Sequence, residues 1–302
     1  MSAANPLPTP KLPALSAGKY AWYGWLGIAL LLVSWLLNWT LPGPRTFFLF
    51  FPLWLGYCLA LDALNLRRGG TSLLTRSRRA FIGLFLVSAP SWWLFELLNS
   101  RVQNWHYLGA GLLTPWQYFI AASINFSIVT PAVFESAELL AGTGWLRRLG
   151  PWIQVRPDAR TTRGFFAAGV LMLALLLAWP RYCFPFLWIS IYCILEPVNI
   201  WAGGRSLAEF TARRDWRPVL SLFFGALLTG FFWELWNFYS FPKWVYTVPF
   251  VNVLHIFEMP LLGYGGYLPF SLEVFALYHL AAGLLAKAFP RLTPTRDYVR
   301  VS

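Results

Sequence analysis

Acidic residues inside apolar stretches are the feature of this chain that could do chemistry. Of its 12 acidic residues, eight lie in such stretches: Asp62, Glu96, Glu135, Glu138, Glu196, Glu234, Glu258 and Glu273. A lone carboxylate in an apolar setting is costly unless it is protonated, paired or hydrated. Each of these residues is therefore a candidate proton donor or acceptor, although a protonated acid that only bridges two helices would leave the same pattern.

Glu234 and Glu273 are the strongest candidates for an acid and a base. Glu234 lies four residues before the end of an apolar stretch at 238, and Glu273 lies about six residues into the next one. A helix rises about 1.5 Å per residue, so both carboxyl groups are expected at similar depth, where two carboxyls can share one proton. Asn237 follows Glu234 by three residues on the same helix face and is expected to orient it. The same reasoning applies earlier in the chain to Glu96, Asn99 and Glu135.

Other residues near this pair extend the candidate site. His255, Glu258 and His279 are candidates for a proton relay. With three histidines in the chain and no HxxxH or HExxH motif, no metal site is expected. Aromatic side chains that could wall a cation, a sterol or a polyene lie close to the acid in sequence: Trp233, Trp236, Trp244 and Tyr246.

The same polar residues occur twice along the chain, which indicates an internal duplication. With a shift of 138 positions, the second set repeats the first: Glu96, Asn99, Pro131 and Glu135 recur as Glu234, Asn237, Pro269 and Glu273. With a shift of 134 positions, an earlier block also recurs: Trp54, Asp62, Asn65, Gly69, Gly70 and Ser72 return as Trp188, Glu196, Asn199, Gly203, Gly204 and Ser206. Two apolar sequences would rarely share acids, amides and glycine pairs in this order.

The composition indicates a membrane protein, because 58% of the residues are hydrophobic and only 12% are charged, against roughly 25% charge in soluble domains. Eight stretches are long enough to cross a bilayer: 21–41, 46–66, 80–99, 115–141, 163–179, 182–201, 217–238 and 267–286. We expect an all-α polytopic protein of about eight transmembrane helices, arranged as two four-helix repeats. An even number of spans gives both repeats the same orientation in the membrane.

The expected organisation has five parts: a disordered cytoplasmic tail at 1–20, the first repeat at 21–150, a cytoplasmic linker at 151–162, the second repeat at 163–290 and a cytoplasmic tail at 291–302. The second repeat alone carries His255, Glu258 and His279, so we expect it to bear the site. Before the last helix of each repeat, an apolar but broken stretch predicts a re-entrant or interfacial segment. In the first repeat, 115–141 could instead be one long helix kinked at Pro131.

The distribution of basic residues predicts the orientation. Alternate loops hold 20 of the 24 lysines and arginines, which places those loops and both termini in the cytoplasm of a cell with this protein in its plasma (inner) membrane. Asp62 and Glu196 then lie near the cytoplasmic ends of their helices. Anionic lipid head groups are the expected partner of this face, and nucleic acid is not. The Gly-Gly turns after these acids either join helices tightly or cradle a phosphate.

The order of these elements resembles a known family. Each half has an acid, then a Trp-x-Tyr element, then a proline followed by a glutamate. The elements are Trp105, Tyr107, Pro131 and Glu135 in the first half, and Trp244, Tyr246, Pro269 and Glu273 in the second. This resembles the integral-membrane, non-flavin lycopene cyclases of carotenoid synthesis, which are built from two homologous membrane domains and carry a Pro-x-Glu-Glu-x-x-Phe element. Here the glutamate comes four residues after the proline. The resemblance implies protonation of a polyene by a carboxylic acid, cyclisation and loss of a proton, without a redox cofactor.

The residues and the resemblance together favour an integral-membrane enzyme without a cofactor, which performs acid–base chemistry on an isoprenoid or polyene-like lipid. The alternatives are a proton-coupled transporter of small solutes, in which the same acids carry protons, and a non-catalytic membrane scaffold. A transporter should connect Asp62 and Glu196 with Glu96 and Glu234 by a polar path, whereas an enzyme should have a closed pocket on the outer side that opens laterally to lipid.

Overall fold

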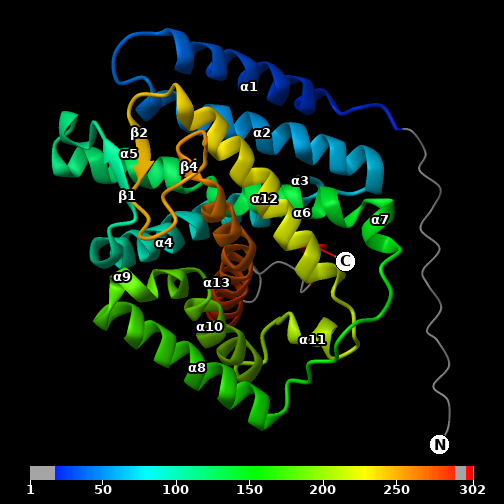
Figure 1. Ribbon diagram of the computed structural model, residues 1–302. Coiled ribbons are helices and arrows are strands. Elements are labelled where there is room, and N and C mark those ends of the chain that lie inside the picture. The colour runs from blue at the N-terminus through cyan, green and yellow to red at the C-terminus, as the bar shows by residue number, and fades with distance from the viewer. Residues whose placement is uncertain (1–17, 290–296, 302) are drawn as a thin grey trace, which may run out of the picture.

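The structure is a computed structural model that describes residues 18–289 and 297–301. The expected tail at 1–20 therefore lies almost wholly outside the described residues. The first half of the chain contains seven α-helices, one strand and a 3-10 turn (Figure 1): α1 (Trp22–Thr40), α2 (Thr46–Gly69), α3 (Leu73–Arg76), α4 (Arg78–Val102), β1 (Trp105–Leu108), η1 (Ala110–Leu112), α5 (Pro115–Phe126), α6 (Val129–Ala141) and α7 (Gly144–Arg147).

The second half repeats much of this order with more irregular connections. Its elements are α8 (Ala159–Ala178), α9 (Pro180–Cys183), η2 (Phe184–Trp188), α10 (Ser190–Trp201), α11 (Ala208–Thr211), α12 (Arg217–Phe238), β2 (Lys243–Tyr246), β3 (His255–Ile256), β4 (Met259–Pro260), η3 (Leu261–Gly266) and α13 (Tyr267–Ala288). The strands were not predicted; they are short, and β3 pairs with β4 in a separate two-residue hairpin.

Seven helical segments in the described chain are long and apolar enough to cross a membrane, which makes this a helical, multi-pass membrane protein. They correspond to seven of the eight expected stretches. The eighth is not one straight helix: Pro180–Trp188 and Ser190–Trp201 meet at an angle of 41° and make an eighth span only if the bent pair is counted as one. Pro185, inside η2, lacks the backbone N–H that a continuous helix needs there.

The segments before the last helix of each half differ from one another. The 115–141 stretch is long enough to cross a membrane as one segment, but it breaks between α5 and α6, at Ser127 and Ile128, and not at Pro131 as the alternative of one kinked helix had it. Pro131 is the third residue of α6, where a missing N–H breaks no helical hydrogen bond. In the second half, the expected interruption is confirmed: residues before Tyr267 form turns, the β3–β4 hairpin and η3.

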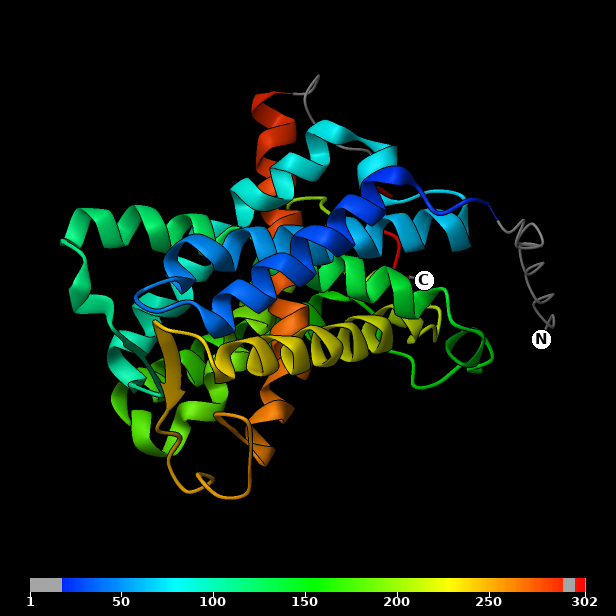
Figure 2. The same ribbon diagram turned by 90° about the horizontal axis from the view of Figure 1, so that it is seen from above.

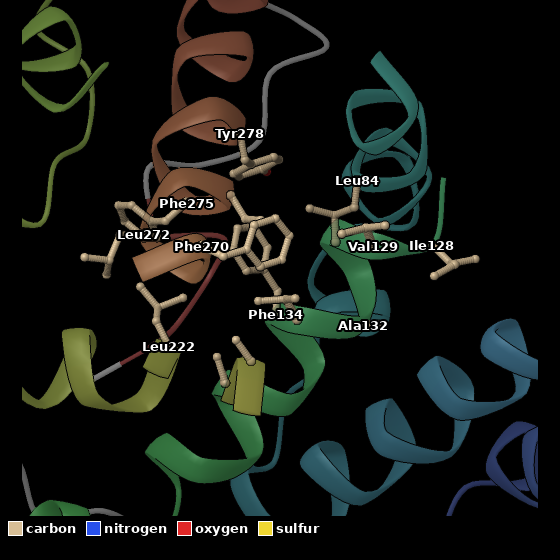
Figure 3. Packing of buried hydrophobic residues seen from close by; sticks show 14 of the residues in the cluster. Leu84, Ile128, Val129, Ala132, Phe134, Leu222, Phe270, Leu272, Phe275 and Tyr278 are labelled. Atoms are coloured by element: carbon tan, nitrogen blue, oxygen red, sulfur yellow. The ribbon is translucent and has the colours of Figure 1, made fainter. Parts of the chain in front are cut away.

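The helices pack in layers with α13 at the centre (Figure 1). Figure 2 shows α1, α2 and α12 running in similar directions while α13 crosses them. The core between α6 and α13 is aromatic (Figure 3), with the Phe134 ring centroid 6.5 Å from Phe275 and 5.3 Å from Tyr278. α6 also lies tightly on α12, because a Cβ at Gly225 would be 2.6 Å from Cα of Ala137. α6, α12 and α13 therefore form the rigid centre against which the other elements lie.

The last described residues, 297–301, lie within the expected tail and pack against the helices. Tyr298, Val299 and Val301 are buried. Ser221 Oγ donates to the carbonyl oxygen of Val301 (2.6 Å), and the backbone N–H of Arg300 donates to Glu138 (2.8 Å). Glu138 also forms an ion pair with Arg76. This acid therefore anchors a chain segment, which sequence spacing did not indicate.

Candidate functional site

Strands β1 and β2 bring the two halves of the chain together. They pair antiparallel, with Trp105 opposite Tyr246 and Tyr107 opposite Trp244. Each Trp-x-Tyr element thus faces the equivalent element of the other half. Alternate residues of a strand share one face, so the ring-bearing residues of both strands lie on the same face of this small sheet and can point together toward the helices that carry Glu96 and Glu234.

Glu96, on α4, accepts three hydrogen bonds at a single oxygen. The donors to Oε1 are the Tyr107 hydroxyl (2.6 Å), Trp105 Nε1 (3.0 Å) and Trp92 Nε1 (2.9 Å). Trp92 lies one helical turn before Glu96 on the same face of α4. Two indoles and a phenol thus fix this partly buried carboxylate.

Glu234, on α12, is held by two phenols instead. Its Oε1 accepts from the hydroxyls of Tyr246 and Tyr267, each at 2.7 Å. The Tyr246 oxygen in turn accepts from Trp244 Nε1 at 2.8 Å. Glu234 is fully buried, and its Oε2 has no hydrogen-bond partner among the described residues. One oxygen is therefore engaged by phenols, while the other remains able to take a proton.

A glycine explains why the donors differ. The residue 138 positions after Trp92 is Gly230, and a Cβ at Gly230 would be 2.5 Å from Cε2 of Tyr267. The Tyr267 ring therefore fits only because position 230 has no side chain. In the first half, the position equivalent to Tyr267 is Val129, which has no hydroxyl group. The indole that supports Glu96 from its own helix is thus replaced, at Glu234, by a phenol from α13.

The two asparagines hold the strands rather than the acids. Asn99 Nδ2 donates to the Trp105 carbonyl oxygen (2.8 Å), and its Oδ1 accepts from the N–H of Asn104 (2.8 Å) and of Trp105 (3.3 Å). Asn237 donates to the Trp244 carbonyl (2.7 Å) and accepts from the Trp244 N–H (3.0 Å). The expectation that Asn237 orients Glu234 directly is therefore wrong, because its bonds position β2 and, through β2, Tyr246.

An aromatic pocket lies next to both acids. It spans about 1080 Å³ of space between protein atoms, open solvent included, and is only partly enclosed. Its wall includes Tyr107, Tyr246 and Tyr267, whose hydroxyls reach the carboxylates, together with Trp233 and Trp244. The aromatic contribution is large, since 13 of the 23 lining residues are Phe, Trp or Tyr. An apolar ligand in this pocket would contact the tyrosine side chains, and the carboxylates of Glu96 and Glu234 would lie behind those side chains.

The phenols of the strands stay protonated. Burial raises the pKa of Tyr107 and of Tyr246 well above the ordinary value of 10.0, and the neighbouring carboxylates of Glu96 and Glu234 raise it further. Both hydroxyls therefore serve as hydrogen-bond donors over the ordinary pH range.

Trp236 does not belong to the pocket. It is 1% exposed, and its ring centroid lies 4.8 Å from that of Trp54 and 5.1 Å from that of Phe232. The expectation that it binds substrate is wrong, because its helix turns it toward α2. Trp233, three residues earlier, does reach the pocket and lies 5.7 Å from the Trp92 ring.

The expected pairing of Glu234 with Glu273 is not observed. Glu273 is fully buried on α13, and its Oε1 accepts from the backbone N–H of Ile191 at the start of α10 (3.1 Å). Glu135 is likewise placed away from Glu96: its Oε2 and its carbonyl oxygen accept from Asn65 Nδ2 at 2.9 and 3.0 Å. Depth along the chain could not reveal that each glutamate turns toward another helix.

The proposed relay residues are also spread apart. His255 is exposed, and its Nε2 lies 3.1 Å from Asn252 Oδ1. Glu258 forms an ion pair with Lys243, which lines the pocket, so Glu258 lies near its rim. His279 is buried on α13 with its ring 4.2 Å from that of Phe275. Within the described residues, no hydrogen bond joins these three side chains to Glu234. The described residues also contain no group of three potential metal ligands.

Asp62 and Glu196 have matching structural positions. Each accepts a backbone N–H from a residue twelve positions later: Leu74 N–H to Asp62 Oδ2 and Ala208 N–H to Glu196 Oε1, both at 2.8 Å. The turns between acid and amide pass through Gly70 (φ 69°) and Gly203 (φ 72°), a conformation that favours glycine. These acids hold the amides after the turns, so the arrangement favours tight helix-joining turns over a phosphate cradle.

Sequence reasoning missed two residues that contact the acids, Trp92 and Tyr267. Trp92 lies four residues before Glu96, and that spacing could have identified it. Tyr267 carried no such signal, because the duplicated position is Val129.

The fold and this site define a multi-pass helical membrane protein with an aromatic pocket beside one buried and one partly buried carboxylate. Comparisons of the chain with protein-family models, with curated proteins and with solved structures give no match. What the pocket does must therefore be inferred from its own geometry.

Proposed function

We propose that this protein is an integral-membrane enzyme that binds an isoprenoid or polyene-like lipid in the aromatic pocket and catalyses acid–base chemistry on it. Cyclisation, isomerisation and hydration are the reactions that such chemistry serves. One observation carries the proposal: Tyr107, Tyr246 and Tyr267 line a mostly apolar pocket, and their hydroxyls are hydrogen-bonded to the carboxylates of Glu96 and Glu234. An apolar wall with a few placed polar groups is typical of small-molecule sites.

The phenols of the second half are the proposed contact with substrate. A proton leaving a substrate carbon would pass to the Tyr246 or Tyr267 oxygen as that phenol passes its own proton to Glu234. In the reverse direction, Glu234 returns the proton and the phenol gives one to an alkene carbon. A cyclisation uses both directions once, so no atoms or electrons are gained or lost by the protein. Tyr246 and Tyr267 are the proposed catalytic residues, and Glu234 is the proton store behind them.

The aromatic wall supports the same chemistry. Protonation of an alkene leaves a carbocation, and the faces of Trp and Tyr rings attract positive charge. Trp233, Trp244 and Trp92 surround the space in front of the phenols. The resemblance to the two-domain lycopene cyclases leads to the same substrate class, with the Trp-x-Tyr elements as its common point.

We further propose that the fold consists of two parallel repeats, 21–150 and 163–290, with both termini in the cytoplasm of a cell whose plasma membrane holds the protein. Equivalent residues with equivalent bonds support this: Asn99 and Asn237 each hold a strand tryptophan, and Asp62 and Glu196 each hold an amide twelve residues later. In this arrangement the arginine-rich turns face anionic lipid head groups.

Proton-coupled transport has less support. The described hydrogen bonds do not join Glu96 or Glu234 to Asp62 or Glu196. A separate polar cluster contains Tyr57, Ser136 and Thr229: the Tyr57 hydroxyl and Thr229 Oγ1 each lie 2.8 Å from Ser136 Oγ. No described hydrogen bond connects this cluster to any of those four acids. A purely structural scaffold has no need of phenols aimed into a pocket.

The test is mass spectrometry of lipid extracts from a polyene-producing host. Cells would make the unsubstituted protein, Glu234→Gln, Glu273→Gln or none of these. Glu273→Gln is the matched control, because it removes a buried carboxylate away from the pocket and keeps an oxygen for the Ile191 amide. We expect a new isoprenoid species with the unsubstituted protein and with Glu273→Gln, but not with Glu234→Gln. Identical profiles from all four cultures would reject the enzyme for the polyenes of that host.

A further inference from the structure

A second pocket lies between α8, α10, α12 and the segment that precedes α8. It contains about 680 Å³ of empty space and is separate from the aromatic pocket in its lining residues. Most of its wall is apolar, including Val155, Pro157, Phe165, Pro197 and Trp216. The polar side chains at this pocket include Glu196, Arg156, Thr161 and Tyr192, whose phenol lies close to Glu196 without closing its Oε2.

Glu196 is a buried acid with one unsatisfied oxygen in this pocket. The residue is 3% exposed. Its Oε1 accepts the N–H of Ala208, whereas its Oε2 has no hydrogen-bond partner among the described residues. Leaving a carboxylate oxygen buried without a donor is costly, and a donor on a ligand would remove that cost.

In the equivalent acid of the first half, Asp62, both carboxylate oxygens accept hydrogen bonds from the protein itself. Asp62 Oδ1 accepts the hydroxyl of Tyr23 at 2.7 Å. The position 138 residues after Tyr23 is Thr161, which lines the second pocket with a side chain too short to replace a phenol. α1 also lies directly on α2 at this level, since a Cβ at Gly24 would be 2.3 Å from Cβ of Ala63. The first half therefore has neither the space nor the free oxygen that the second half has.

The helix packing of the second half explains the space. α8 makes its close approach to α10 at Gly169, where a Cβ would be 2.9 Å from the backbone N of Ile194. The positions equivalent to Gly24 and Gly27 are Thr162 and Phe165, whose larger side chains line the pocket.

We propose that this pocket binds a ligand with a primary ammonium group, which donates to Oε2 of Glu196 while an apolar body lies along the pocket wall. An ammonium is the donor that a buried carboxylate favours most, because it supplies both hydrogen bonds and the opposite charge. Arg156 lies at the same pocket, is exposed and forms no ion pair within the described chain, so it can contact a phosphate of the same ligand. A phospholipid with an ethanolamine head group has all three features.

The experiment is native mass spectrometry of the purified full-length protein in detergent. Three probes separate the sources of the ammonium group: phosphatidylethanolamine, phosphatidylcholine and soluble glycerophosphoethanolamine. The choline head group carries a charge but no N–H donor. We expect phosphatidylethanolamine to be retained about tenfold more than phosphatidylcholine, the factor that one charge-assisted hydrogen bond provides. Retention of the soluble amine at the same concentration would support the ammonium site and assign it to a free ligand.

Two substitutions and one control test the assignment. Glu196→Gln keeps an oxygen for the Ala208 amide and should remove the preference, whereas Asp62→Asn, at the closed site, should keep it. Thr161→Tyr places the phenol of the first half in the second and should also abolish retention, with the acid still present. Equal retention of both lipids by the unsubstituted protein would overturn the proposal, as would an unchanged preference in Glu196→Gln and Thr161→Tyr. Neither result bears on the aromatic pocket.

Discussion

Glu96 and Glu234 receive hydrogen bonds from the same kinds of side chain, but in different numbers. Both acids lie on a long helix, both accept the phenol of a Trp-x-Tyr strand, and in both an asparagine three residues later holds that strand. Glu96 also receives two indole N–H groups at the same oxygen. Glu234 instead receives a second phenol, and its other oxygen is buried without a partner.

The difference matters because indoles and phenols do different chemistry. An indole N–H only donates a hydrogen bond, whereas a phenol can both give and take a proton. Two of the three donors of Glu96 therefore only fix the carboxylate, whereas both donors of Glu234 can relay protons between it and the pocket. Two differences produce this contrast. Gly230 with Tyr267 stands where the first half has Trp92, and the Trp244 indole donates to Tyr246, whereas the Trp105 indole donates to Glu96.

Substitution of the acids themselves should give the largest effect. Glu234→Gln removes the proton store and should lower the rate of product formation by about 10²- to 10⁴-fold, the usual contribution of general acid–base catalysis. Glu96→Gln should lower it only about tenfold, because Glu96 positions ring systems of the pocket without a relay. Product formation in isolated membranes, normalised to the amount of folded protein, measures both. Equal losses in the two variants would mean that the halves are equivalent.

The second phenol of Glu234 should have the next largest effect. Tyr267→Phe removes it without a change of shape and should lower the rate about tenfold. Gly230→Ala should act in the same direction, because the new Cβ would be 2.5 Å from the Tyr267 ring and must displace it. In the first half, Tyr107→Phe leaves Glu96 with two indole donors and should lower the rate only about twofold. A larger loss of rate from Tyr107→Phe than from Tyr267→Phe would mean that the proton relay lies in the first half, which would contradict the prediction.

Loss of the strand-holding amides should change stability more than chemistry. Asn99→Ala removes three hydrogen bonds to buried backbone groups, and Asn237→Ala removes two to Trp244. Each should lower the free energy of unfolding by about 1–3 kcal/mol, with the larger loss for Asn99→Ala. Unfolding in mixed micelles, followed by tryptophan fluorescence, would measure this. If Asn237→Ala were as stable as the unsubstituted protein, its strand would be held by other contacts.

Alkaline pH should give the smallest effect, and only above the ordinary range. Because burial and the adjacent carboxylates raise the pKa of Tyr107 and Tyr246 above 10.0, their contribution to stability is complete below about pH 10. It is lost as the pH rises through their folded values, since the unfolded chain releases those protons first. Thermal unfolding between pH 7 and pH 11, with Tyr107→Phe and Tyr246→Phe as controls, checks the sign. Stability that falls between pH 7 and pH 9 in a tyrosine-dependent manner would contradict it.

Local sequence signals predicted some parts of the site well. Apolar length identified the membrane-spanning helices, because each must satisfy its backbone hydrogen bonds within itself. Acids in apolar stretches identified Glu96 and Glu234, and the Trp-x-Tyr elements identified their strand donors. Spacing failed for Glu273 and Trp236, because one helix presents different residues to different neighbours. Position along the helix gives depth, but the direction of a side chain depends on which helices surround it.

The sequence alone determined that this chain is an apolar, multi-pass helical protein with paired acids, paired amides and paired Trp-x-Tyr elements. These are properties of composition and of order along the chain. Only the tertiary structure decided that β1 and β2 meet across the two halves, that Tyr267 takes the space left by Gly230, and that Glu273 turns away from Glu234 toward Ile191. Each of these depends on contacts between residues far apart in sequence, where one missing side chain determines which ring can approach a carboxylate.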